Sequence, residues 1–333
     1  MKLVISELKE RARYTSREAA YIIRALINNH GWKQIETEEL YYASGSLRSL
    51  LLSKFEELPE VILWWEGYYL LNARRREIES LDCGKYVLCD DLHGGEEHSQ
   101  QEMLDAFSMV DTILSTYGYV FDNFYPELAK TKRIVWTPHS ASPDFLVPFN
   151  EHPENAILLS GAVHYYYPLR LRVNALHDRG SYPIVLHPHP GHRCDFDHET
   201  NTSIGRGYAN LINRYRTAFT DSSIYKYSVA KYFEIPATGS LLLADRAISE
   251  PLTRIGFVEG VHYIGVSDED LEEKIEYVLD EGNHPELDQV RRNGQNLVWL
   301  RHKTSDRARS IDEICTLEDK SSQSQRFVGS QPC

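Results

Sequence analysis

Residues 231–244, KYFEIPATGSLLLA, decide the fold of this chain. The first part carries one acidic residue, Glu234, among apolar and aromatic neighbours, which predicts a short helix against a core. We expect the helix to end at Pro-Ala-Thr-Gly, and the apolar residues 241–244 that follow predict a buried strand. In an α/β domain, a junction of this kind lies beside the crevice where nucleotides bind.

Glu234 has two interpretations at this stage. A carboxylate at the crevice can accept two hydrogen bonds from a ribose diol, whereas a plain helix-surface carboxylate would be solvated. The segments that follow favour the crevice. Asp245 ends the strand, a loop of sequence GFVEG spans residues 256–260, and a short strand at 263–266 precedes a helix capped by Ser267.

This order of segments resembles the C-terminal half of the spore-coat-type glycosyltransferases, relatives of glycosyltransferase family 4 with the GT-B fold. The shared pattern is K/R-x-F-E-x-x-A-x-G, an apolar strand, Asp, a helix, F-x-x-G, a strand and a D-x-x-E/D-L helix. It covers about residues 155–315, with a weaker likeness over 1–150. The resemblance implies an α/β protein with two Rossmann-like domains facing a cleft and a C-terminal helix that packs back on the first domain.

Composition is consistent with this architecture. The 333 residues suit two domains, and a hydrophobic content of 42% is typical of a globular protein. A net charge of −13 argues against non-specific nucleic-acid binding, which needs Lys and Arg to neutralise phosphates. Five scattered cysteines without a CxxC pair, and no apolar run near 20 residues, predict a cytoplasmic chain without a transmembrane segment.

Alternating apolar runs and helical patterns predict parallel sheets covered by helices in both halves. Three prolines between residues 141 and 154 mark an interdomain connection. We therefore expect an N-terminal acceptor domain over 1–145 and a nucleotide-sugar domain over 155–300. The resemblance implies a terminal helix over 301–316 that returns to the first domain. The Ser/Gln-rich composition predicts a flexible tail over 317–333.

A small-residue turn at Gly161 follows the first strand of the second half and leads into a helix with Arg170 and Arg172. The free amides and the dipole of a helix N-terminus favour a diphosphate. The resemblance implies that an arginine and a lysine neutralise this diphosphate, and Arg170 or Arg172 with Lys231 are the nearest equivalents. Surface cations on helices are the alternative. By the same resemblance, Gly239 takes the glycine position of the shared pattern and belongs to the donor site.

Two histidines of the first half are further candidates. His93 follows a predicted strand and resembles the family's histidine near the donor sugar, so we expect it to be catalytic, with a core or capping histidine as the alternative. The glycine pair after it, Gly94-Gly95, suits close approach to a ligand. His139 stands in a turn that resembles the end of the family's first domain. It either faces the cleft or orders the linker.

The chain departs from the family at two places. Family 4 enzymes commonly carry another Glu, near the donor sugar, eight residues before the Glu of the shared pattern. In this chain Lys226 occupies that position. The acidic role is therefore absent or supplied elsewhere. The glycine-rich loop that usually follows the first strand is replaced by residues 7–10, ELKE, so acceptor handling at that loop cannot be inherited.

Residues 187–198, HPHPGHRCDFDH, support a competing hypothesis. Four His, one Cys and two Asp can supply a Zn²⁺ or Mn²⁺ site. The two prolines break regular ligand spacing, and no second ligand cluster appears. The same loop, beginning at His187, can instead contact the donor, or it can be a plain polar loop. No GxxxxGK[ST] loop and no G-x-S-x-G elbow occur, which disfavours NTPase and α/β-hydrolase chemistry.

By resemblance, then, we predict a glycosyltransferase that moves a sugar from a UDP- or GDP-sugar to a glycan, glycoprotein or other hydroxyl acceptor. The resemblance implies retention of anomeric configuration, with no metal or other cofactor required. Two alternatives stay open. One is a metal-dependent hydrolase that uses residues 187–198, and the other is a non-catalytic protein that binds nucleotide sugars or carbohydrates.

Overall fold

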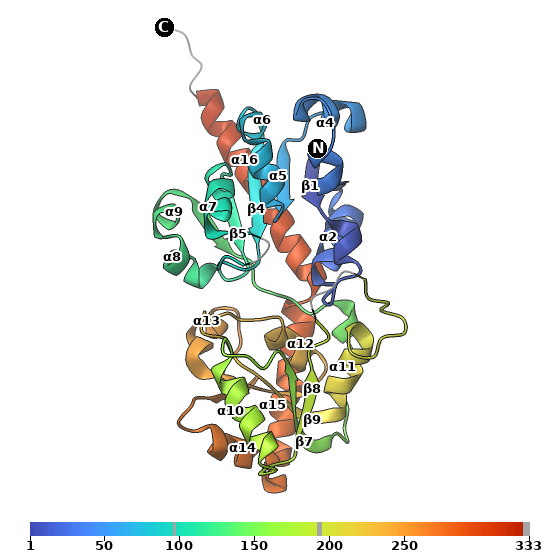
Figure 1. Cartoon of the computed structure of the whole chain (residues 1–333), viewed down its shortest axis with the longest axis vertical. Coiled ribbons are helices and arrows are strands. Elements are labelled where there is room, and N and C mark those ends of the chain that lie inside the picture. Colours follow the sequence, from blue (N-terminus) through green and yellow to red (C-terminus); the bar gives the residue numbers. More distant parts are fainter. Residues whose placement is uncertain (96–97, 192–194, 329–333) are drawn as a thin grey trace. The chain divides into compact units, whose positions relative to one another are not determined.

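The computed structural model describes residues 1–95, 98–191 and 195–328 (Figure 1). The chain forms two compact units, each assembled from separate segments. Unit 1 comprises Met1–Arg11, Ile22–Pro138 and Ser305–Cys333, and unit 2 comprises Ala12–Tyr21 and His139–Thr304. Each unit has one parallel sheet with helices around it, so the predicted α/β class is confirmed.

Unit 1 contains a six-stranded parallel sheet in the order β2-β1-β3-β4-β5-β6. Its strands are β1 (Lys2–Ser6), β2 (Lys33–Glu36), β3 (Val61–Trp65), β4 (Gly84–Cys89), β5 (Thr112–Ser115) and β6 (Arg133–Trp136). Its helices are α1 (Leu8–Arg11), α3 (Thr37–Tyr41), α4 (Leu47–Phe55), α5 (Tyr68–Ala73), α6 (Arg75–Glu79), α7 (Gln100–Ser108), η1 (Gly118–Val120), α8 (Phe121–Phe124) and α9 (Pro126–Thr131). All five residues of β3 are buried, as expected for a central strand of a sheet covered on both faces.

Two helices cross a unit boundary along the chain: α2 (Glu18–His30) and α16 (Thr304–Val328). Within unit 1, Asp312 of α16 accepts a hydrogen bond from Trp32 Nε1 at 2.7 Å and pairs with Lys2. The predicted return of the terminal helix to the first domain is therefore confirmed. The helix continues to Val328, beyond the expected end at 316. The predicted flexibility of 317–333 stays a prediction, and 329–333 lie outside the described residues.

Unit 2 contains a five-stranded parallel sheet in the order β11-β10-β9-β7-β8. Its strands are β7 (Glu154–Gly161), β8 (Ile184–Pro188), β9 (Tyr215–Thr220), β10 (Leu241–Asp245) and β11 (Ile264–Val266). Its helices are η2 (Pro143–Phe145), α10 (Pro168–Asp178), α11 (Gly205–Arg214), α12 (Lys231–Ala237), η3 (Arg246–Ile248), α13 (Ser249–Arg254), α14 (Leu271–Leu279), η4 (Glu281–Asn283) and α15 (His284–Arg301).

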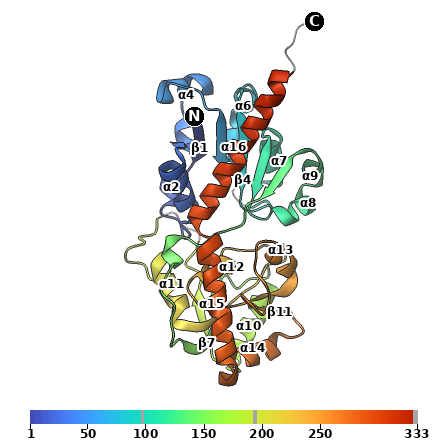
Figure 2. The same ribbon diagram turned by 180° about the vertical axis from the view of Figure 1, so that it is seen from behind.

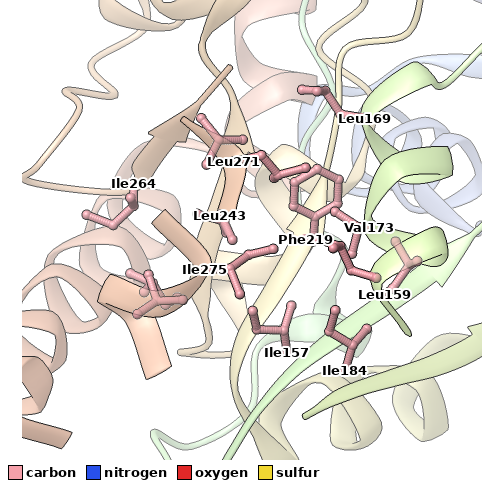
Figure 3. Packing of buried hydrophobic residues seen from close by; sticks show 14 of the residues in the cluster. Ile157, Leu159, Leu169, Val173, Ile184, Phe219, Leu243, Ile264, Leu271 and Ile275 are labelled. Atoms are coloured by element: carbon pink, nitrogen blue, oxygen red, sulfur yellow. The ribbon is translucent and has the colours of Figure 1, made fainter. Parts of the chain in front are cut away.

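The core of unit 2 explains why the decisive stretch folds as expected. Alternate residues of the strands, such as Ile157 and Leu159 of β7 and Leu243 of β10, pack against α10 and α14 (Figure 3). Helices α11 and α12 lie on the other side of the sheet, as the two opposite views show (Figures 1 and 2). The turns at the carboxyl ends of β7 and β9 therefore lie between the two helical layers, where ligands bind in open α/β sheets.

Among the residues that the structure describes, no helix combines the length and the apolar character needed to cross a lipid bilayer.

Candidate functional site

The candidate site in unit 2 is built around the turn that ends β7. Gly161 has a φ of +97°, in the region that favours glycine. A Cβ atom added there would lie 3.0 Å from Lys231 Cε and 3.2 Å from Arg170 Nη1. Three of the predicted donor-binding residues thus converge on one turn, although they come from β7, α10 and α12.

Arg170 fixes this turn from within the unit. Its side chain is buried, and its Nε lies 3.0 Å from Asp221 Oδ1. Nη2 donates to Thr220 Oγ1 at 2.9 Å and Nη1 to the carbonyl of Ala162 at 3.3 Å. Burial raises the pKa of Asp221 to about 6, although the Arg170 guanidinium acts in the opposite direction. Arg170 is therefore tied to the protein, and it adds positive charge next to Gly161.

Lys231 differs from Arg170 in its partners. Its Nζ lies 5.3 Å from the ring centroid of Tyr208, and the Tyr208 hydroxyl is 2.6 Å from Ser160 Oγ. Within the described parts of the chain, the Lys231 ammonium forms no hydrogen bond and no ion pair. A half-buried cation without a direct ion pair, next to a turn where no side chain fits, suits an anionic ligand.

His187, at the carboxyl end of β8, belongs to the same group. Its ring stacks on Tyr208 with centroids 6.1 Å apart and an angle of 19°. Burial, and then the nearby Lys231, lower the pKa of His187, so the imidazole is neutral near pH 7. Its Nε2 is buried and has no hydrogen-bond partner among the described residues. This contact with Tyr208 and Lys231 brings the start of the histidine-rich segment to the Gly161 turn.

Glu234 lies one helical turn after Lys231 on α12 and is only 7% exposed. The interpretation as a solvated helix-surface carboxylate is therefore wrong. Burial raises the pKa of Glu234, and the Lys231 ammonium partly opposes this. Across residues 1–95, 98–191 and 195–316, no group donates a hydrogen bond to its carboxylate. A mostly buried carboxylate that receives no hydrogen bond from the protein can accept hydrogen bonds from the hydroxyl groups of a ligand.

Members of two ion pairs of unit 2 lie close enough to Glu234 to change its pKa. In one, His139 Nδ1 lies 2.7 Å from Glu18 Oε2, and the Ser140 hydroxyl donates to Glu18 Oε1 at 2.7 Å. Burial alone would raise the pKa of Glu18, but the His139 and Ser140 contacts hold it below its usual value. His139 thus ties the start of α2 to the segment after residue 138, as the linker-ordering alternative predicts. A ligand contact of His139 stays a prediction.

In the second pair, Arg17 holds Asp144 at 2.6 Å and 3.1 Å through Nη2 and Nε. Sequence reasoning missed Arg17, Glu18 and Asp144, as well as Asp221 and Tyr208. No motif marks them, and residues 12–21 belong to unit 2 only because of the tertiary fold. A basic and an acidic residue before an apolar helix gave no signal, because the same pattern is typical of ordinary helix starts.

Two predicted residues of unit 2 do not join the site. Arg172 pairs with Asp268 on the exposed side of α10 and donates to its carbonyl at 2.9 Å. Gly239 follows Thr238, the C-cap of α12, and a Cβ on Gly239 would lie 2.9 Å from Phe149 Cδ2 and 3.1 Å from Gln295 Nε2. Gly239 is therefore required by packing, and Arg172 corresponds to the surface-cation alternative.

His93 belongs to unit 1, in the loop after β4. It is half-buried, and burial lowers its pKa. The carbonyl of the preceding Leu92 accepts a hydrogen bond from the Tyr125 hydroxyl at 3.0 Å, which fixes the loop. A Cβ on Gly94 would lie 2.8 Å from the Gln100 nitrogen, so the chain itself explains this glycine without a ligand. The catalytic role of His93 stays a prediction.

The histidine-rich segment is only partly described, because His192, Arg193 and Cys194 lie outside the described residues. Asp197 accepts hydrogen bonds from the Glu199 nitrogen and the Thr200 hydroxyl, and His198 Nε2 lies 2.8 Å from the Tyr14 carbonyl. The described part of the chain holds no group of three or more His, Cys, Asp or Glu residues placed to bind a metal ion.

Taken together, the geometry provides a glycine turn, an unpaired ammonium and a neutral imidazole on one side, and a buried carboxylate one helical turn away. The first three can bind phosphate oxygens, and the carboxylate can accept hydrogen bonds from hydroxyl groups.

Comparison with known proteins agrees with this chemistry. Residues 186–313 match the model of a family described as glycosyl transferase-like. None of the curated proteins compared with the chain matches its sequence. Sucrose-phosphate synthase from Thermosynechococcus elongatus is similar in structure, with a TM-score of 0.64 and 11% identity over 99% of both chains.

Two further solved structures carry nucleotides. An alpha-glucosyltransferase in complex with UDP and mismatched DNA has a TM-score of 0.59 and 11% identity, over 95% of this chain and 100% of its own. Anabaena HepE in complex with UDP and glucose has a TM-score of 0.53 and 10% identity, over 94% of this chain and 99% of its own. The chain thus shares the GT-B fold of these structures, and residues 186–313 are similar to a glycosyl transferase-like family.

Proposed function

We propose that unit 2 binds a nucleotide-sugar donor and that the enzyme transfers the sugar to a hydroxyl group of a glycan or glycoprotein. The observation that carries this proposal is the pair of unsatisfied groups on α12. Among the described residues, Lys231 forms no direct ion pair or hydrogen bond and Glu234 receives no hydrogen bond, although the two opposite charges lower each other's energy. A nucleoside diphosphate supplies both, because its phosphates are anionic and its ribose carries a diol. The UDP in two similar structures supports a UDP- or GDP-sugar.

Departure of the leaving group is the main electrostatic problem of this reaction, because negative charge builds on the β-phosphate. The amides of the Gly161 turn and the Lys231 ammonium would stabilise that charge, with Arg170 raising the local potential from behind. Catalysis would then need neither a metal ion nor another cofactor. On the family resemblance, we also propose that the configuration at the transferred carbon is retained. His93 would assist from unit 1, in the region 1–145 proposed to bind the acceptor.

Donor binding tests the proposal directly. Thermal-shift and calorimetric titrations with UDP, GDP, ADP and dTDP should identify one nucleotide that binds. We expect Glu234→Ala to weaken that binding by about 1–3 kcal/mol, because a charged hydrogen-bond acceptor is lost. Glu250→Ala is the matched control, since Glu250 is an exposed carboxylate of unit 2 paired with Arg254 on α13. Equal affinity of the Glu234→Ala variant and the wild type would remove Glu234 from the site.

Turnover is tested separately. Release of free nucleoside diphosphate from the matching sugar donor, measured with and without EDTA, distinguishes transfer from binding alone. We expect release in both conditions, with His93→Ala slowing it while leaving donor affinity unchanged. Loss of activity in EDTA would contradict the metal-independent mechanism, and a normal rate in His93→Ala would remove the catalytic role from that residue.

A further inference from the structure

A group of aromatic side chains, two of them exposed and two half-buried, follows the Gly161 turn. We call it the tyrosine patch, and it consists of His164, Tyr165, Tyr166 and Tyr225. Ring centroids of Tyr165 and Tyr166 are 4.1 Å apart, and His164 lies 4.2 Å from Tyr165. Tyr225 extends the patch, with its ring 5.6 Å from Tyr166. The rings are tilted against one another by 34° to 46°, and such a cluster of aromatic rings at a protein surface is an area that water does not solvate well.

The patch is held by two loops that the sheet order brings together. One loop follows β7 and the other follows β9, and these strands are neighbours in the parallel sheet. The Ile224 nitrogen donates to the Tyr166 carbonyl at 2.8 Å and joins the loops. Ser223 and Lys226 of the second loop have φ values of 59° and 61°, which non-glycine residues rarely adopt. The backbone therefore fixes the patch before any ligand arrives.

Large hydrophobic side chains in and next to the patch are exposed to solvent. Tyr165 is 60% exposed, and the neighbouring Ile224 is 49% exposed. Tyr227, the next aromatic residue along the second loop, is buried and supports Tyr225 with a ring separation of 5.4 Å. The two loops thus bury one tyrosine as an anchor and present others to a ligand.

The patch is continuous with the proposed phosphate site. The Arg170 guanidinium stacks 3.9 Å above the ring of Tyr167, the residue that follows the patch in the first loop. The same guanidinium lies 3.2 Å from the position of a Cβ on Gly161. Glu234, in contrast, lies on α12, in the helical layer on the opposite side of the sheet from α10 (Figures 1 and 2).

From this placement we propose that the tyrosine patch is the subsite for the sugar ring of the donor. The inference rests on the proposed function. If Glu234 binds the ribose, the ribose lies on the α12 side of the sheet. The sugar on the β-phosphate, at the other end of the donor, then points toward the α10 side, where the patch lies. A pyranose has an apolar face of C–H groups and a rim of hydroxyls. Tyrosine matches both, because its ring packs on the C–H face and its phenol bonds the rim.

The experiment compares each nucleoside diphosphate with its glucose ester in calorimetric titrations. The variants are Tyr165→Ala and Tyr225→Ala, and Tyr165→Phe retains the ring without the phenol. Tyr42→Ala is the control, since Tyr42 is an exposed tyrosine outside the patch. We expect the two patch variants to bind the glucose ester about tenfold more weakly, from the loss of one aromatic contact. Their affinity for the nucleoside diphosphate alone should match the wild type, and Tyr165→Phe should retain most of the affinity.

Each other outcome overturns the inference in its own way. Weaker binding of the nucleoside diphosphate itself would place the base, and not the sugar, on the patch. The patch would not be the sugar subsite if the variants bound the glucose ester as tightly as the wild type does. The same follows if no hexose ester bound the wild type more tightly than the nucleoside diphosphate alone. Binding of no nucleoside diphosphate by the wild type would refute the proposed function as well. Tyr165 is mostly exposed, so its replacement leaves the fold intact.

Discussion

At the scale of single residues, Glu234 and Arg170 show that burial has opposite consequences for paired and unpaired groups. Arg170 contacts three polar partners and the ring of Tyr167, and its charge is paired with Asp221. Glu234 is buried without a hydrogen bond from the described residues, and its pKa is raised for that reason. A protein retains such a carboxylate at a stability cost when a ligand uses it.

The raised pKa of Glu234 predicts a pH dependence of nucleotide binding. The ionised carboxylate accepts hydrogen bonds from the ribose, so affinity should fall as the pH decreases through this raised pKa. In the Glu234→Gln variant, position 234 has no titrating group. The phosphates of the nucleotide and His187 are unchanged between the variant and the wild type. The ratio of wild-type to Glu234→Gln affinity, measured by calorimetry between pH 8 and 5, should therefore shrink toward low pH. A constant ratio would refute the assignment.

The same shift has a consequence for stability. The pKa of Glu234 is raised in the folded state, so its contribution to stability is full at low pH and is lost as the pH rises through that pKa. Glu234→Gln should therefore raise the free energy of unfolding of the ligand-free protein at neutral pH, and the gain should vanish in acid. Urea unfolding at pH 7.5 and pH 5 measures both values. A variant that is less stable at pH 7.5 would contradict this.

The two arginines of α10 provide a second prediction. Arg170→Ala leaves Asp221 buried without its cation, which should lower the free energy of unfolding by about 3–5 kcal/mol. Arg172→Ala removes an exposed ion pair and should cost at most about 1 kcal/mol. Urea unfolding of both variants, followed by circular dichroism, gives the comparison. Similar losses in the two variants would contradict the different roles that the structure gives them.

At the scale of elements, the turn between β7 and α10 places two constraints on Gly161: a positive φ and close neighbouring side chains. Gly161 needs a positive φ and has Lys231 and Arg170 against it. Gly180, just after the end of α10, also has a positive φ of 67° but has no atom within 4 Å of an added Cβ. The two glycines therefore separate backbone strain from crowding at the site.

We expect Gly161→Ala and Gly180→Ala each to lower the free energy of unfolding by about 1–2 kcal/mol, because both force a side chain into the left-handed region. Only Gly161→Ala should also weaken nucleotide binding, since its methyl group displaces Lys231. Unfolding and calorimetric titrations of both variants test this. Normal nucleotide affinity in Gly161→Ala would move the phosphate site away from the turn.

At the scale of the whole molecule, each unit is completed by a segment from the other end of the chain. Residues 12–21 complete unit 2, and residues from 305 onward complete unit 1. Ala308, Ile311 and Cys315 of α16 are fully buried, and the Tyr86 hydroxyl lies 3.5 Å from the Cys315 carbonyl. Unit 1 thus depends on residues from 305 onward, which unit 2 separates in sequence from the rest of unit 1.

Asp312 is the polar anchor of this helix. Asp312→Ala removes the acceptor for Trp32 and Lys2 and should destabilise unit 1 by about 1–3 kcal/mol. The neighbouring Glu313→Ala is the control, because Glu313 is exposed on the same helix. Hydrogen exchange should show faster opening of β1 and β4 in Asp312→Ala, with β7 and β10 unchanged. Equal protection in both variants would show that apolar packing alone holds α16.

The sequence by itself determined the two parallel α/β sheets, the short helix before β10 and the residue types at the Gly161 turn. These follow from local periodicity and from glycine and proline, which act within a few residues. Only the tertiary structure decided that Arg170, and not Arg172, faces the turn, and that Glu18 and Asp144 lie near Glu234. The reason is physical: burial and charge pairing here join residues from 50 to 127 positions apart in the sequence, and a local pattern does not encode such pairings.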